Sequence, residues 1–176
     1  MALAIGDLDR DGDDDLVIGD RVTGISIYHN DGAGTFDKAA TSFPPIANAL
    51  AMADVDRDGD LDVVAGISGA ADWILVNDGQ GGLADSGQRL GAFDTTAIAV
   101  ADFDLDGDPD FVAGHADAVD VLWLNDGTGR FVESGRALFA GETRALAAVD
   151  LDCDGDADLV VGDGAEPGAN SVWLNR

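Results

Sequence analysis

The sequence contains very little cysteine, histidine and lysine. Its 176 residues include one cysteine, Cys153, two histidines and one lysine, Lys38. A lone cysteine has no partner within the chain, which excludes an internal disulfide framework. So few sulfur and nitrogen ligands also exclude a soft transition-metal centre. Cys153 is therefore interpreted as a small filler in its loop.

Positive charge is scarce as well, since nine basic residues stand against 35 acidic ones and the net charge is −26. Phosphate groups would meet a repulsive surface, which argues against nucleic acid as a partner. The hydrophobic content of 46% argues against disorder. No run is long and apolar enough to span a membrane. The start, Met1-Ala2-Leu3, belongs to a repeated pattern rather than to a signal peptide.

The motifs of common catalytic sites are absent too. The sequence has no nucleophile elbow, no phosphate-binding loop and no His-Glu zinc pair. His29 and His115 have no catalytic companions at a repeated spacing. They are interpreted as surface residues or as residues that surround a site without acting in it. The sequence therefore predicts a protein that is not an enzyme.

What the sequence does contain is one nine-residue motif, Asp-x-Asp-x-Asp-Gly-Asp-x-Asp, four times: at 7–15, 54–62, 102–110 and 150–158. Acids at positions 1, 3 and 5 followed by glycine at position 6 begin an EF-hand calcium loop, and the acid at position 9 closes it early. The glycine is expected to take the backbone through a left-handed bend. Asp-Gly clusters also form ordinary turns, and charge runs are often solvated.

Five acids in nine residues go beyond what a turn needs, because close carboxylates repel one another by roughly 1–4 kcal/mol per pair. Four such clusters predict counter-ions, and calcium fits better than magnesium because it tolerates a crowded, irregular oxygen shell. The sequence thus predicts Ca²⁺ at about four sites per chain. The candidate metal residues are Asp7, Asp9, Asp11, Asp13, Asp15, Asp54, Asp56, Asp58, Asp60, Asp62, Asp102, Asp104, Asp106, Asp108, Asp110, Asp150, Asp152, Asp154, Asp156 and Asp158.

The motifs start 47, 48 and 48 residues apart, and a period of this length is typical of propellers or solenoids. An alanine-rich run precedes each motif, at 2–5, 50–53, 97–101 and 145–149. Alanine favours helix, but runs this short suit an innermost strand in a crowded place. A β-branched run closed by glycine follows each motif, at 16–19, 63–66, 111–114 and 159–162.

A third run in each period ends in asparagine, at 25–30, 73–77, 121–125 and 172–175. In the first three periods Asn-Asp-Gly follows, a hairpin signal, and a further strand opens with Phe36, Leu83 or Phe131. The predicted fold is all-β: a β-propeller of four-stranded antiparallel blades whose last blade lacks its outer strand. One propeller or part-propeller domain is expected over 1–176, with repeats at about 1–47, 48–95, 96–143 and 144–176.

The short last blade leaves three alternatives open. The chain is a fragment of a longer propeller, or a lone four-bladed ring, or its last blade is completed by another molecule. An uncovered edge strand tends to recruit a partner, which favours a homo-oligomer that completes the propeller.

The motif, followed by Leu-Val-Val-Gly and by Trp-Leu-Asn-Asp-Gly, resembles the FG-GAP/VCBS repeat of integrin α-chains and of many secreted bacterial proteins. The resemblance implies a propeller in which each calcium loop joins the first two strands of a blade. It implies side-chain ligands at positions 1, 3, 5 and 9 and a backbone oxygen at position 7. Pro109, at position 8, departs from the family's pattern only because proline restricts the local backbone. Alanine-rich segments replace the Phe-Gly of the family name, which suits the bacterial branch better than integrins.

The function implied is a non-enzymatic calcium-binding scaffold for adhesion or for a protein or other ligand. Extracellular loops of this chemistry bind calcium at about 10⁻⁴–10⁻³ M, so the expected location is secreted or at the cell surface. A carbohydrate-binding lectin with pockets between blades is the alternative. Trp73, Trp123 and Trp173 would then be stacking platforms rather than packing between blades. Part of a polysaccharide lyase is a third reading, disfavoured by few, scattered arginines.

Overall fold

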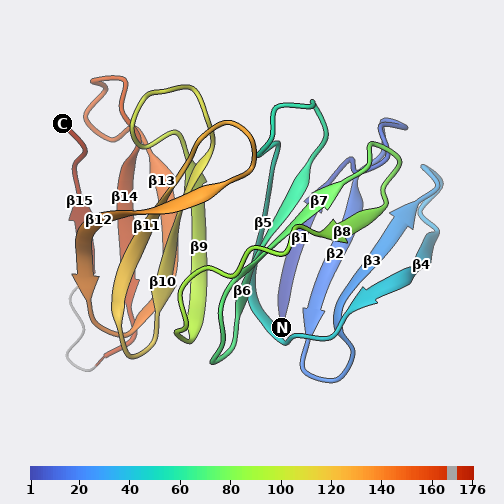
Figure 1. The fold of residues 1–176 in the computed structure, drawn as a ribbon, viewed down its shortest axis with the longest axis horizontal. Coiled ribbons are helices and arrows are strands. Elements are labelled where there is room, and N and C mark those ends of the chain that lie inside the picture. Colours follow the sequence, from blue (N-terminus) through green and yellow to red (C-terminus); the bar gives the residue numbers. More distant parts are fainter. Residues whose placement is uncertain (166–169) are drawn as a thin grey trace.

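The computed structural model describes residues 1–165 and 170–176, and all regular structure in these ranges is β-strand (Figure 1). Blade 1 consists of β1 (Ala2–Gly6), β2 (Asp15–Asp20), β3 (Gly24–Asn30) and β4 (Phe36–Phe43). Blade 2 consists of β5 (Ala47–Ala53), β6 (Asp62–Ile67), β7 (Trp73–Asn77) and β8 (Leu83–Asp85). Blade 3 consists of β9 (Thr95–Ala101), β10 (Asp110–His115), β11 (Val119–Asn125) and β12 (Phe131–Ala140). Blade 4 consists of β13 (Thr143–Val149), β14 (Asp158–Asp163) and β15 (Ser171–Trp173).

Within each blade the strands follow chain order and every pair is antiparallel. The all-β prediction is confirmed, with sheets of four, four, four and three strands among the described residues. The predicted outer strands open at Phe36, Leu83 and Phe131. Each nine-residue motif connects the first and second strands of its blade. No described helix is long and apolar enough to cross a membrane.

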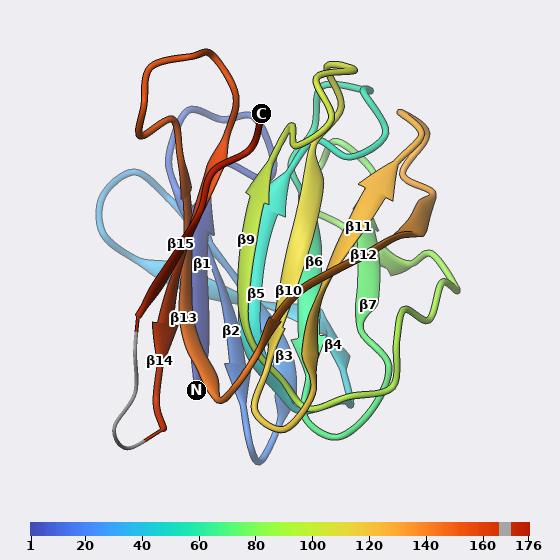
Figure 2. The same cartoon turned by 90° about the vertical axis from the view of Figure 1, so that its left-hand side faces the viewer.

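The blades are arranged like those of a propeller, one beside the next in chain order (Figure 1). The innermost strands β1, β5, β9 and β13 stand nearly upright in both views, and each packs against the next (Figures 1 and 2). Three buried apolar clusters lie between consecutive blades, one for each of the three junctions. The described part of the chain has no such cluster between blade 4 and blade 1, so the four sheets form an open arc.

In blades 1 to 3 the glycine near the end of the second strand makes room for the next blade. A Cβ atom on Gly66 of β6 would lie 2.6 Å from Thr95 Cγ2 and 3.1 Å from Ile98 Cδ1, both on β9 of the next blade. A Cβ atom on Gly114 would lie 2.5 Å from Thr143 Cγ2. Contacts this short exclude a side chain, so the repeated glycine is a consequence of blade packing.

The tryptophans lie in the clusters between blades. Trp123 is buried and stacks beside Phe111, with ring centroids 6.3 Å apart. Trp73 and Trp173 are partly buried at the other two junctions, and the guanidinium of Arg89 covers the Trp73 ring at 3.8 Å. This arrangement agrees with packing between blades rather than with open stacking platforms.

Candidate metal centres

The backbone of each nine-residue loop passes through two left-handed residues. The expected bend at the glycine is present in all four loops, with φ of 95° at Gly12, 91° at Gly59, 92° at Gly107 and 100° at Gly155. Position 4 is left-handed as well, with φ of 63° at Arg10, 62° at Arg57, 63° at Leu105 and 61° at Cys153. Residues with a Cβ pay roughly 1–2 kcal/mol for this conformation. Nothing in the residue types at position 4 predicted it.

Each loop brings carboxylates together. In every loop three aspartates offer oxygens that all lie within 4.8 Å of one another. The groups are Asp7, Asp9 and Asp11; Asp54, Asp56 and Asp58; Asp102, Asp104 and Asp110; and Asp150, Asp152 and Asp158. Oxygen-only groups of this size could hold a hard cation.

The two carboxylate oxygens of the first aspartate in each loop indicate whether a cation would fit there. Its Oδ2 accepts the N–H of the loop glycine, at 3.1 Å in Asp7, 3.0 Å in Asp54, 2.9 Å in Asp102 and 3.2 Å in Asp150. The Oδ1 atoms of Asp7, Asp54 and Asp102 are buried and accept no hydrogen bond from the described residues. A buried acceptor without a donor costs about 1–3 kcal/mol, and more when it is charged. A cation bound at Oδ1 would remove that cost.

The ninth aspartate is fully buried in every loop and ties the loop to the third strand. In blade 2, Asp62 Oδ2 accepts the N–H of Val55 at 2.9 Å and its Oδ1 accepts the N–H of Asn77 at 2.8 Å. Asp15, Asp110 and Asp158 make the same pair of bonds in their blades. Burial raises the pKa of Asp62 and of Asp110 to about 6, against the effect of these backbone donors. Since burial disfavours the charged form, a nearby cation would stabilise it.

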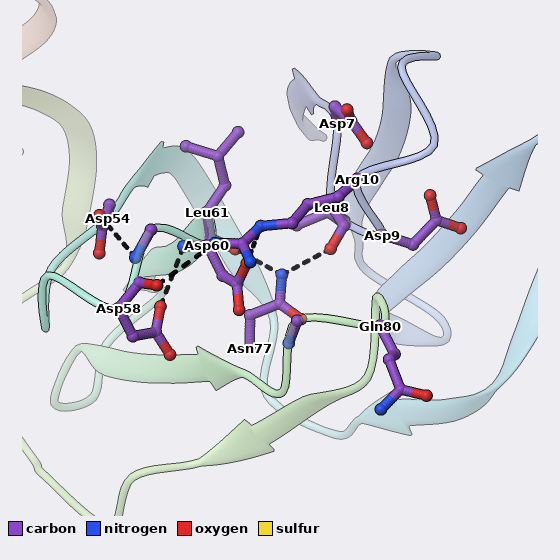
Figure 3. Close-up of polar contacts among 12 residues, drawn as sticks. Asp7, Leu8, Asp9, Arg10, Asp54, Asp58, Asp60, Leu61, Asn77 and Gln80 are labelled. Carbon is purple, nitrogen blue, oxygen red and sulfur yellow. Dashed lines mark hydrogen bonds and ion pairs between the residues drawn. The ribbon is translucent and has the colours of Figure 1, made fainter.

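In loops 2 and 3 the seventh aspartate directs its carboxylate towards the preceding blade rather than into the cluster. Arg10 of loop 1 forms an ion pair with Asp60 of loop 2, and its Nη2 donates to the Asp58 carbonyl at 3.3 Å (Figure 3). Arg57 of loop 2 repeats the ion pair with Asp108 of loop 3. Leu105 and Cys153 occupy the corresponding place in the other loops. The carboxylates of Asp13, Asp60, Asp108 and Asp156 are in none of the described clusters.

The two histidines and the cysteine lie in three different environments. His29 lies beside loop 1, with Nδ1 3.6 Å from Asp15 Oδ2 and 3.8 Å from Asp9 Oδ2. His115 is buried, and its Nδ1 lies 2.7 Å from the Val119 carbonyl. Cys153 is exposed, so its interpretation as a filler is wrong. Leu105, at the same position of its loop, is exposed as well.

Sequence comparison finds the FG-GAP-like repeat at residues 7–65, 54–113 and 102–161, which together span most of the chain. No curated protein sequence matches. Each of the three matches begins at a first motif aspartate and ends within or beside the second strand of the following blade.

Solved structures resemble this chain in fold. The computationally designed protein Ika4 has a TM-score of 0.59 and 21% identity over 98% of this chain and 88% of its own. A lectin from Agrocybe aegerita, solved for its specific recognition of non-reducing terminal N-acetylglucosamine, has a TM-score of 0.61 and 22% identity over 97% of this chain and 51% of its own. BBS1N, solved in complex with ARL6DN, has a TM-score of 0.63 and 15% identity over 92% of this chain and 50% of its own. The present chain thus spans about half the length of the last two.

Proposed function

Because the chain belongs to the FG-GAP-like repeat family, we propose that it is a non-enzymatic calcium-binding β-propeller module. It serves as a scaffold for adhesion or for interaction with a protein or other ligand. The observation that carries the proposal is the buried, unpaired Oδ1 of Asp7, Asp54 and Asp102 inside clusters of oxygen ligands. Oxygen-only ligands on an irregular loop match calcium better than magnesium or a softer metal.

In this proposal the ligands are the side chains at loop positions 1, 3, 5 and 9 and the backbone oxygen at position 7. Calcium has a structural role, since it offsets carboxylate repulsion where the first strand of a blade turns into the second. An ion that binds only the folded chain stabilises it by about 2.7 kcal/mol per site at a hundredfold excess over Kd. Sites at about 10⁻⁴–10⁻³ M fill only where calcium is plentiful. A secreted or cell-surface location follows.

Thermal unfolding in calcium, magnesium and EGTA tests the proposal. Calcium should raise the melting temperature far more than magnesium at the same ionic strength, and EGTA should reverse the rise. Asp102→Asn should lose part of the calcium effect, because it removes one of the unpaired buried oxygens. The matched control is Asp37→Asn on the exposed surface of β4, with the same change of charge. A melting temperature that EGTA leaves unchanged would refute calcium binding.

Carbohydrate binding is the second candidate, and it rests on a hollow beside blade 3. An open cavity of about 460 Å³ is lined by the exposed Phe93 and Val119 and by the charged Glu133 and Arg136. An apolar ring beside a few polar groups is a common composition for a small-ligand site. The similarity to a lectin of known sugar recognition supports this candidate. A glycan array on wild type and Phe93→Ala tests it: loss of a sugar signal in the variant supports the site, and an array without signal rejects it.

A further inference from the structure

Blade 4 exposes residues whose counterparts in blades 1 to 3 are buried at the three junctions within the chain. Position 2 of the loop is buried by the next blade in Leu8, Val55 and Phe103, whereas Leu151 is 46% exposed. In the third strand Ile27, Ile74 and Leu122 are buried, whereas the corresponding Val172 is 54% exposed. We call the surface around Leu151 and Val172 the front face of blade 4.

Blade 1 exposes the opposite surface. At the internal junctions the outward side chains of the innermost strand pack on the preceding blade: Met52 Sδ approaches the Cβ position of Gly6 at 3.0 Å, and Leu146 Cδ1 approaches that of Gly114 at 3.0 Å. The corresponding residues of β1 are Leu3 and Ile5, which are 48% and 57% exposed. We call this surface the back face of blade 1. It is the surface that a front face covers elsewhere in the chain.

A polar link repeats at each junction. The side-chain amide of Asn77 donates to the Leu8 carbonyl of the preceding blade at 2.8 Å and to Leu61 O of its own blade at 3.0 Å (Figure 3). Asn125 donates to Val55 O at 2.7 Å and Asn175 to Phe103 O at 2.7 Å. Among the described residues, the side-chain amide of Asn30 in blade 1 donates only within its own blade, to Asp14 O at 3.1 Å. The carbonyl of Leu151 is the fourth member of the acceptor series and lies at the front face of blade 4.

The two open faces therefore match each other in apolar residues and in hydrogen bonding, but they belong to the first and last blades of an open arc. We propose that a second copy of this chain covers both: its blade 1 packs on the front face of blade 4, and its blade 4 packs on the back face of blade 1. Two identical junctions related by a twofold axis close a ring of two copies. Eight sheets lie within the four to eight blades typical of propellers, whereas three copies would exceed that range. This inference rests on the propeller module proposed above and names its partner.

Sedimentation velocity in calcium tests the assembly. The wild type should have twice the 18.0 kDa mass of the chain. Ile5→Asp on the back face and Val172→Asp on the front face should each give monomers. Val132→Asp, at an equally exposed valine on the outer strand β12, is the matched control and should remain a dimer. A monomeric wild type throughout a concentration series, or dimers of both face variants, would overturn the proposal.

Mixing the two face variants tests the head-to-tail arrangement. Ile5→Asp keeps its front face and Val172→Asp keeps its back face, so an equimolar mixture should regain dimers through one intact junction. A symmetric front-to-front or back-to-back contact predicts instead that one variant dimerises alone and that mixing restores nothing.

The single cysteine supplies a proximity test. Arg10 in loop 1 reaches Asp60 in loop 2 of the next blade, so Cys153, at the same loop position, should face Asp13 of the second copy. A short bismaleimide linker should join Asp13→Cys chains into covalent dimers, and Cys153→Ser should abolish the product. An unlinked Asp13→Cys chain would contradict the proposed junction.

Failure of this assembly is distinguishable from failure of calcium binding. The monomeric Val172→Asp chain retains all four loops, so calcium should still raise its melting temperature. A monomeric wild type with a normal calcium response would reject the ring alone.

Discussion

Blades 2 and 3 each lie between two neighbours, whereas blades 1 and 4 have one neighbour each within the chain. The four loops carry the same acids, yet their surroundings differ. Position 2 is buried in loops 1 to 3 and exposed in loop 4. The first aspartate differs as well: Asp54 in loop 2 has a buried, unpaired oxygen, whereas Asp150 in loop 4 is exposed. The following blade, rather than the loop itself, thus supplies the low-dielectric wall of each candidate site. Equal motifs need not bind or stabilise equally.

The largest expected effect is a difference in stability between variants of Phe103 and Leu151, two apolar residues at the same loop position. Phe103→Ala should lower the free energy of unfolding by about 3–5 kcal/mol, because it leaves a cavity between blades 3 and 4. Leu151→Ala should change it by no more than about 0.5 kcal/mol in a monomeric chain, because the side chain is already exposed. Urea unfolding in calcium, in the monomeric Val172→Asp background, measures both. Equal losses would show that the two ends of the arc are not open.

Replacing the first loop aspartate is expected to change the stability in opposite directions in calcium and in EGTA. In calcium, Asp54→Asn should lose one site, a loss of about 2.7 kcal/mol at a hundredfold excess over Kd. In EGTA the same change should be stabilising, since it neutralises a carboxylate whose Oδ1 is buried without a hydrogen-bond donor. Asp150→Asn should lose a site in calcium but gain little in EGTA, because Asp150 is exposed.

Calorimetric titration and unfolding in the two buffers measure these changes. A loss of stability in both buffers for Asp54→Asn would mean that the carboxylate is needed for folding itself rather than for the ion.

Blades 2 and 4 also differ in a titratable group outside the loops. Burial raises the pKa of Asp72 from 3.8 to about 7, although the Ile67 N–H and the Thr95 hydroxyl of the next blade both donate to its carboxylate. In blade 4 the corresponding residue is Asn170, whose Oδ1 accepts the Asp163 N–H at 3.2 Å. The chain thus contains a neutral counterpart of Asp72 at its open end.

A folded-state pKa above the unfolded value means that the native chain holds the extra proton. The stability from Asp72 is then fully present below about pH 4 and is lost as the pH rises towards 7. Asp72→Asn should remove this fall and be more stable than wild type at pH 8, by on the order of 1–2 kcal/mol. Urea unfolding between pH 5 and pH 8 measures it. Parallel stability curves for the two proteins would show that Asp72 titrates normally.

The sequence predicted the features that depend on local chemistry and period. Aspartate spacing placed the loops between the first and second strands, and Phe36, Leu83 and Phe131 marked the outer strands. The features that it did not predict are mainly contacts between blades, from residues as far apart as the 23 positions between Asp72 and Thr95 or the 50 positions between Arg10 and Asp60. The Arg10–Asp60 ion pair and the Asp72–Thr95 hydrogen bond give no periodic signal, because each occurs in only some of the blades. The burial of His115 was not predicted either, because it involves the Val119 carbonyl and the Phe93 ring, which belong to no repeated motif.

The smallest expected effect comes from adding an ion pair between blades 3 and 4, where the pair found at the other two junctions is missing. Arg10 and Arg57 pair with Asp60 and Asp108 of the following loops, but Leu105 holds the same left-handed position opposite Asp156. Leu105→Arg should create a third ion pair and raise the free energy of unfolding by about 0.2–1 kcal/mol, since the arginines of the existing pairs are half exposed. The double variant Leu105→Arg, Asp156→Asn is the control and should lose the gain, which high salt should also reduce. A gain that survives both changes would come from replacing an exposed leucine, and the junctions would then differ in more than this one pair.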